Sequence, residues 1–129
     1  KNVYIIGTMN DIDRSVESMD FALRRRFAWK EITAQESSVI IDYADISPDL
    51  QDEAKTAMNY LNEKIGEMLG REYHIGGAYF KKIELYKNDD APFVRLWENH
   101  IEGVLFEYLR GVDGVSRKME ELKIAYESR

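Results

Sequence analysis

Polar side chains follow an apolar run near the start of the chain. Residues 3–6 are β-branched or aromatic, which predicts a buried strand, and Asn10 and Asp13 come shortly after it. Ligands of parallel α/β sheets bind at the carboxyl ends of the strands. An asparagine amide both donates and accepts, so Asn10 could orient a water molecule or contact a phosphate. Alternatively, both residues are turn formers bonded to their own backbone, and the residue types alone favour this second interpretation.

Three consecutive arginines, Arg24, Arg25 and Arg26, form the second candidate for chemistry. Their charges repel one another, and arginine is the residue best suited to bidentate phosphate contact. The run could equally be a solvated helix end, where cations suit the helix dipole. The residues alone leave the two interpretations equally open.

The elements that must position these residues come from the first third of the chain. Residues 18–24 resemble a short helix with Ser18 as its N-cap, and residues 27–32 resemble a second strand. Thr33 and Glu36 have the spacing of a capping box, which predicts a helix from Thr33 to about residue 44.

Three amphipathic helices are predicted in the remainder. The first is capped by Ser47 and ended by Gly70, the second runs from Pro92 to Gly111, and the third covers 115–127. Apolar side chains recur on one face of the first two helices at Leu50, Ala54, Met58, Leu61, Ile65 and Met68, and at Phe93, Leu96, Trp97, Ile101, Leu105 and Tyr108. The order strand, helix, strand and then helices only predicts part of a parallel α/β sheet followed by a helical subdomain.

Composition narrows the class of protein. The chain has 129 residues, 44% of them hydrophobic, which is enough for a folded core. The absence of cysteine excludes disulfides and thiolate metal sites, and two histidines are too few for a His-rich site, so no metal site is predicted within this chain. No apolar run is long enough to span a membrane and no signal peptide is visible, so a cytoplasmic location is expected.

Charge is distributed unevenly along the chain. Residues 33–129 carry twelve Lys/Arg and nineteen Asp/Glu, and this acidic part is expected not to bind nucleic acid through bulk charge. Trp29 and Trp97 are predicted to be core residues. His74 is predicted to lie in a loop or in packing, and His100 to be solvated.

Two contiguous motifs resemble the AAA+ nucleotidase family, and most closely its McrB-like group. A strand ends in Met-Asn-x-x-Asp-Arg-Ser at residues 9–15, and Asp-x-Ala-Leu-Arg-Arg-Arg-Phe follows at residues 20–27. Weaker similarity continues at 75–80 and 97–109. The resemblance implies that residues 1–33 are the C-terminal part of the P-loop α/β nucleotidase core, and residues 34–129 its helical lid.

The resemblance also implies roles for individual residues. Asn10 corresponds to the sensor 1 residue, between the γ-phosphate and the attacking water. Asp13 and Arg14 belong to the signature loop at the same nucleotide site. Arg25 and Arg26 occupy the arginine-finger position and reach the nucleotide of the next subunit in a ring. Phosphoryl transfer needs such positioning and positive charge on the transition state, which agrees with the chemistry of these residue types.

Other family features are missing from this sequence. It contains no Gly-x-x-x-x-Gly-Lys-Ser/Thr loop and no apolar run ending in paired acids, which would hold the phosphates and Mg²⁺. No arginine occurs at Gly76-Gly77-Ala78, where many AAA+ lids carry a phosphate-contacting one. The chain is therefore expected to be a fragment that does not hydrolyse nucleotide by itself.

The functional prediction is an ATP- or GTP-hydrolysing ring protein, the motor of a restriction system. The family implies ATP or GTP with Mg²⁺ as cofactor, a homo-oligomeric ring, an McrC-like nuclease partner, and DNA bound through other domains. One alternative is a MoxR-type AAA+ chaperone ATPase, which shares the sensor and finger residues. A second is a stand-alone helical interaction domain without enzymatic activity.

Overall fold

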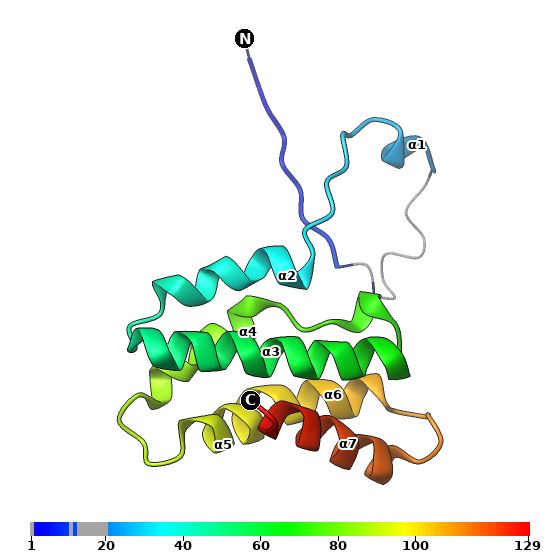
Figure 1. Ribbon diagram of the computed structural model, residues 1–129. Coiled ribbons are helices and arrows are strands. Elements are labelled where there is room, and N and C mark those ends of the chain that lie inside the picture. The colour runs from blue at the N-terminus through cyan, green and yellow to red at the C-terminus, as the bar shows by residue number, and fades with distance from the viewer. Residues whose placement is uncertain (1, 11, 13–20) are drawn as a thin grey trace. The chain divides into compact units, whose positions relative to one another are not determined.

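The structure, a computed structural model, describes residues 2–10, 12 and 21–129. It divides into two units, Lys1–Glu31 and Ile32–Arg129. Figure 1 gives the positions of the helices along the chain. The two units are described separately below.

The first unit contains one short helix, α1 (Phe21–Arg24), among its described residues. The α/β part of the predicted fold is therefore not seen: residues 3–6 and 27–32 were predicted to be strands, but they have no regular secondary structure. A strand is stabilised by hydrogen bonds to a neighbouring strand, and the described residues supply none. Val3, Tyr4, Ile5 and Ile6 are accordingly 74–91% exposed. The predicted N-cap, Ser18, lies outside the described residues.

The second unit begins with a helical run that the capping box predicted. Thr33 Oγ1 accepts the amide of Glu36, and Glu36 Oε2 accepts the amide of Thr33, at 3.1 and 2.8 Å. The α-helical part, α2, is only Ala34–Ser37, and the run continues as a 3₁₀ helix, η2 (Ser38–Tyr43). Start and end were predicted correctly, whereas the change of helix type was not.

The longest helix is α3 (Pro48–Met68), and its predicted signals are confirmed. Ser47 Oγ accepts the amide of Leu50 at 3.3 Å, and Pro48 occupies the first turn. Beyond its C-terminus Gly70 has a φ of 116°, a conformation that other residues rarely adopt.

A short helical stretch that the sequence did not predict follows the turn after α3. It consists of η3 (Arg71–Tyr73), α4 (Gly77–Lys81) and the 3₁₀ segment η4 (Lys82–Tyr86). Each piece is too short to produce a clear apolar period, which explains why the pattern did not reveal it.

The last two predicted helices are present. The first is made of α5 (Pro92–Leu96), a π-helical turn η5 (Trp97–Ile101) and α6 (Glu102–Tyr108). The second is α7 (Val115–Glu127).

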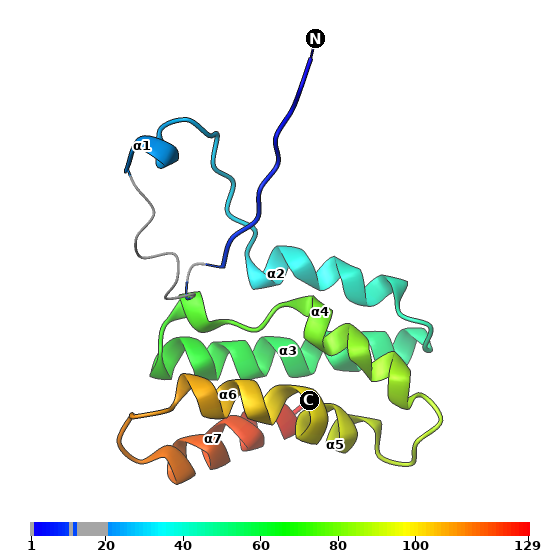
Figure 2. The same ribbon diagram turned by 180° about the vertical axis from the view of Figure 1, so that it is seen from behind.

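The core of the second unit surrounds α3. In both views α2 and η2 lie on one side of α3, whereas α5, α6 and α7 lie on the other (Figures 1 and 2). The apolar stripes predicted for α3 and for Pro92–Tyr108 form this core, together with residues of α4, η4 and α7: Phe80, Ile83, Leu122 and Tyr126. The unit is therefore an all-helical domain with one continuous core.

Two predictions about single side chains require correction. Trp97 is buried as predicted, but Trp29 is 53% exposed and donates its indole N–H to the carbonyl of Arg24 at 2.7 Å. His100 is half-buried rather than solvated, because it packs against Tyr86 of η4.

Candidate functional site

Asn10, the predicted water-positioning residue, lies in an exposed segment of the first unit. Its side-chain Oδ1 accepts the amide of Ile12 at 3.4 Å. This contact is of the kind by which asparagine stabilises a turn. Among the described residues, the amide nitrogen of this side chain has no hydrogen-bond partner.

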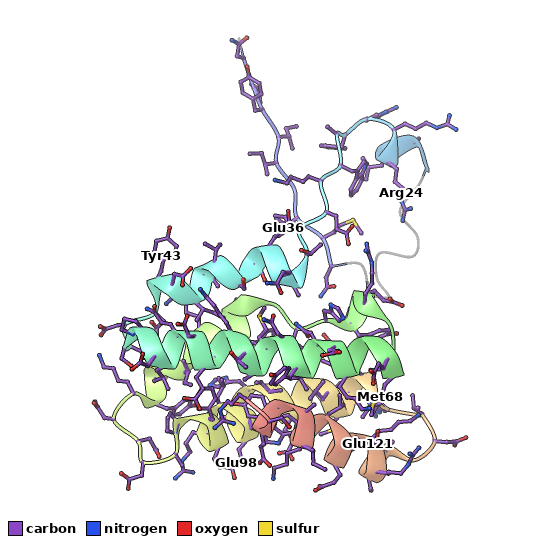
Figure 3. All side chains as sticks on the ribbon, viewed as in Figure 1. Arg24, Glu36, Tyr43, Met68, Glu98 and Glu121 are labelled. Carbon is purple, nitrogen blue, oxygen red and sulfur yellow. The ribbon has the colours of Figure 1, made fainter. Side chains whose placement is uncertain are left out.

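The arginine run follows α1 and faces solvent. Arg24 is the last residue of α1 and is labelled in Figure 3, and the amide of Arg26 donates to the carbonyl of Leu23 at 3.1 Å. The side chains of Arg24, Arg25 and Arg26 are exposed, and no carboxylate among the described residues pairs with them. Exposed guanidinium groups of this kind suit contact with an anion such as a phosphate.

The described residues do not bring the predicted site residues into one cluster. No hydrogen bond or ion pair joins Asn10 to Arg25 or Arg26 there. Asp13 and Arg14, predicted to contact the nucleotide, lie outside the described residues.

In the second unit, the most constrained polar contact involves Asn62 of α3. Asn62 is the polar residue that lies in the otherwise apolar core of the described chain, and it is 6% exposed. Its side chain accepts the amide of Ile75 at 2.7 Å and donates to the carbonyl of the same residue at 2.9 Å. A usable signal was present in the sequence, since Asn62 stands between Leu61 and Ile65 on the apolar side of its helix.

A second contact holds the same turn from the other side. Ser37, the last residue of α2, donates its hydroxyl to the carbonyl of Ala34 at 2.6 Å and accepts the amide of Gly77 at 2.9 Å. The turn from Ile75 to Gly77 is thus tied to α3 by one side chain and to α2 by another.

Basic and aromatic side chains gather where η4 meets the π-helical turn. Tyr86 and His100 are hydrogen-bonded at 2.9 Å between Oη and Nε2, and Lys82 lies 5.2 Å from the centre of the Tyr79 ring. Burial, and after it the charge of Lys82, lowers the pKa of His100 below its ordinary value. His100 is consequently held in its neutral form near neutral pH.

Tyr108 of α6 adds a neighbouring aromatic contact. Its ring meets that of Tyr73 edge to face at 5.3 Å, and burial raises the pKa of its hydroxyl. Neither aromatic group coincides with a residue predicted to act on nucleotide.

The remaining candidates do not indicate a metal or membrane site. Within the described part of the chain, no group of three or more His, Asp or Glu side chains is placed to hold a metal ion. Among the described helices, none is long and apolar enough to cross a bilayer. A hollow of about 250 Å³ between α5 and α7 is lined by Phe93, Val94, Trp97, Glu98, Lys123, Tyr126, Glu127 and Arg129. Its residues are not among those predicted to act on nucleotide.

The fold and contacts of the second unit define a small all-helical domain with a central long helix and a tied turn. The model of the McrB α-helical lid domain matches residues 53–115. This part of the chain belongs to the McrB α-helical lid family.

A curated relative is similar over a longer stretch of the chain than the lid model. The chain is 38% identical over 88 residues to the type IV methyl-directed restriction enzyme EcoKMcrB subunit of Escherichia coli K12. The match covers 62% of the chain and 19% of that protein, so the chain corresponds to about a fifth of its relative. No solved structure matches the chain. The resemblance to the McrB-like group inferred from the sequence motifs is confirmed.

Proposed function

We propose that this chain is the C-terminal part of the nucleotidase module of an McrB-like AAA+ protein, the motor subunit of a restriction system. The observation that carries the proposal is the lid family match over residues 53–115. The similarity to a type IV restriction enzyme subunit supports it. The full-length protein assembles into a ring and hydrolyses ATP or GTP with the help of Mg²⁺. The nucleotide and the Mg²⁺ are bound mainly by segments of the protein other than this one.

The proposal divides the chain by role. Residues 1–33 complete the α/β nucleotidase core, and residues 34–129 form the lid. The exposure of the apolar residues 3–6 supports this division, because an apolar β-type run needs a neighbouring strand to cover it. The rest of the nucleotidase core would supply that strand. The partners are further copies of the protein, an McrC-like nuclease, and DNA bound through other domains.

The site residues take defined roles in this reaction. Asn10 holds the attacking water, Asp13 and Arg14 line the nucleotide, and Arg25 or Arg26 reaches across the ring to the neighbour's γ-phosphate. The exposure of the arginine side chains supports the last assignment, since a finger must be able to reach beyond its own subunit.

The arginine assignment is tested in the full-length protein with Arg25→Ala and Arg26→Ala made separately. Replacement of the arginine that acts as the finger should lower the turnover of the protein about 10³-fold, the scale at which such arginines act. Arg110→Ala is the matched control, because Arg110 is an exposed lid arginine paired only with Glu107. The Arg110→Ala variant should therefore show only a small decrease in turnover.

Complementation distinguishes a finger from a structural role. Mixing the finger variant with a second variant that cannot bind nucleotide should restore some hydrolysis, because mixed rings contain an intact finger facing an intact site. If neither arginine lowers turnover in assembled rings, the finger assignment is refuted. The isolated 129-residue chain should show no turnover at all.

A further inference from the structure

Two of the three amide donors of the turn Ile75–Gly77 are already engaged. The amide of Ile75 donates to Asn62, and the amide of Gly77 donates to Ser37. Both acceptors are side chains of neighbouring helices, α3 and α2. A phosphate oxygen placed at this turn would therefore have to displace an existing hydrogen bond to reach the amide of Ile75 or of Gly77.

Gly77 is required here by a close approach of two backbones. A Cβ at this position would lie 2.5 Å from the carbonyl oxygen of Ser37 and 3.0 Å from the Cα of Ser38. Both are backbone atoms, which cannot turn aside as a side chain can. Gly103 of α6 is the opposite case, since a Cβ there would meet nothing within 4 Å.

We propose that the turn Ile75–Gly77 is a joint that fixes α2 and η2 to the body of the lid. Ser37, Asn62 and Gly77 are its positioning residues. In a nucleotidase of the proposed kind, on which this second step rests, the joint makes the first helices of the lid move together with α3 and α4. The turn then contributes to hydrolysis by alignment and not by contact with the phosphates.

The joint predicts that its two sides are coupled. Ser37→Ala removes the acceptor for the Gly77 amide but leaves the contact of Ile75 with Asn62 in place. If the turn is one joint, hydrogen exchange should accelerate about tenfold at Gly77, and also at Ile75 and in η2. Tenfold corresponds to about 1.4 kcal/mol of lost protection. Gly103→Ala is the matched control for Gly77→Ala: it should leave exchange at the turn unchanged and should not lower the melting temperature, because alanine favours a helix more than glycine does.

The exchange experiment on the 129-residue chain has clear outcomes. Acceleration at Gly77 alone after Ser37→Ala would show an isolated hydrogen bond and overturn the joint. Gly77→Ala with the stability and exchange of the wild type would overturn the close approach. Failure of Gly77→Ala to fold, beside normal folding of Gly103→Ala, supports it.

Steady-state kinetics of the full-length protein test the alignment step. Ser37→Ala should lower kcat severalfold, roughly in proportion to the lost alignment, and leave KM for nucleotide unchanged. A raised KM with unchanged kcat would show that the turn binds nucleotide, and would overturn the proposal. If the wild-type protein hydrolyses neither ATP nor GTP, the proposed function fails, while the exchange result still decides whether the joint exists.

Discussion

Removal of the Asn62 side chain should destabilise the lid more than any change of an exposed polar residue. Asn62→Ala deletes two hydrogen bonds, at 2.7 and 2.9 Å, and leaves the amide and carbonyl of the buried residue Ile75 without partners. Each lost hydrogen bond costs about 1 kcal/mol net, and an unsatisfied buried group costs about 1–3 kcal/mol. Because the turn can relax toward water, we expect a total loss of about 2–4 kcal/mol.

Thermal and urea unfolding followed by far-UV circular dichroism measure this loss. For a domain of this size, each kcal/mol lowers Tm by about 4–8 °C, so a fall of roughly 8–32 °C is expected. Asn59→Ala is the matched control, since Asn59 is an exposed asparagine of the same helix, α3. A surface change of this kind stays within about 0.5 kcal/mol.

Asn62→Asp separates hydrogen bonding from side-chain volume. A carboxylate can still accept the amide of Ile75, but it cannot donate to the carbonyl, and it brings a charge into the core. Asn62→Asp should therefore lower the free energy of unfolding at least as much as Asn62→Ala does. If Asn62→Ala and Asn59→Ala differ by less than about 0.5 kcal/mol, the turn does not depend on this side chain, and the reasoning is refuted.

Two further predictions concern the proposed site and the pH dependence of the lid. In the full-length protein, Asn10→Ala should reduce kcat more than nucleotide affinity, because a group that holds the attacking water acts in the transition state; weaker binding with normal turnover of bound nucleotide would exclude the sensor role. The pKa of His100 is lowered in the folded lid, so protonation of this residue favours unfolding. The stability of the lid should therefore fall as pH drops from about 7.5 to about 5.5, through the ordinary pKa of histidine near 6.5. His100→Gln should reduce this fall in Tm, whereas an equal fall in both proteins would mean that the pH dependence has another source.

Helix boundaries were predictable where a local interaction defines them. Thr33 with Glu36, Ser47 with the amide of Leu50, and Gly70 at positive φ each act within a few residues, and each was read correctly from sequence. The same holds for the apolar stripes, because helical period alone decides which face is buried.

Contacts between distant residues were not predictable from local patterns. Asn62 meets Ile75 across 13 positions, and Ser37 meets Gly77 across 40. The pairing of His100 with Tyr86 was missed for the same reason, and His100 was expected in solvent. Such pairs depend on how helices pack, which neither propensity nor spacing specifies.

The strands differ from the helices because they cannot be stabilised locally. A long helix such as α3 satisfies most of its backbone hydrogen bonds within itself, whereas residues 3–6 need a second strand for theirs. The apolar side chains of residues 3–6 are exposed for want of that partner.

The two units differ in what they contribute to the proposed nucleotidase: the first carries the specific motifs and the second carries the packed core. The most specific motifs lie in residues 9–27, whose described side chains have few contacts, whereas the lid has a continuous core of its own. Phosphoryl transfer depends on positioning to within fractions of an ångström. The chemistry assigned to Asn10 and Arg25 therefore requires the sheet and the neighbouring subunit to hold these groups in place. The lid has a continuous core of its own, so under the proposed function it would act as one rigid body in this reaction.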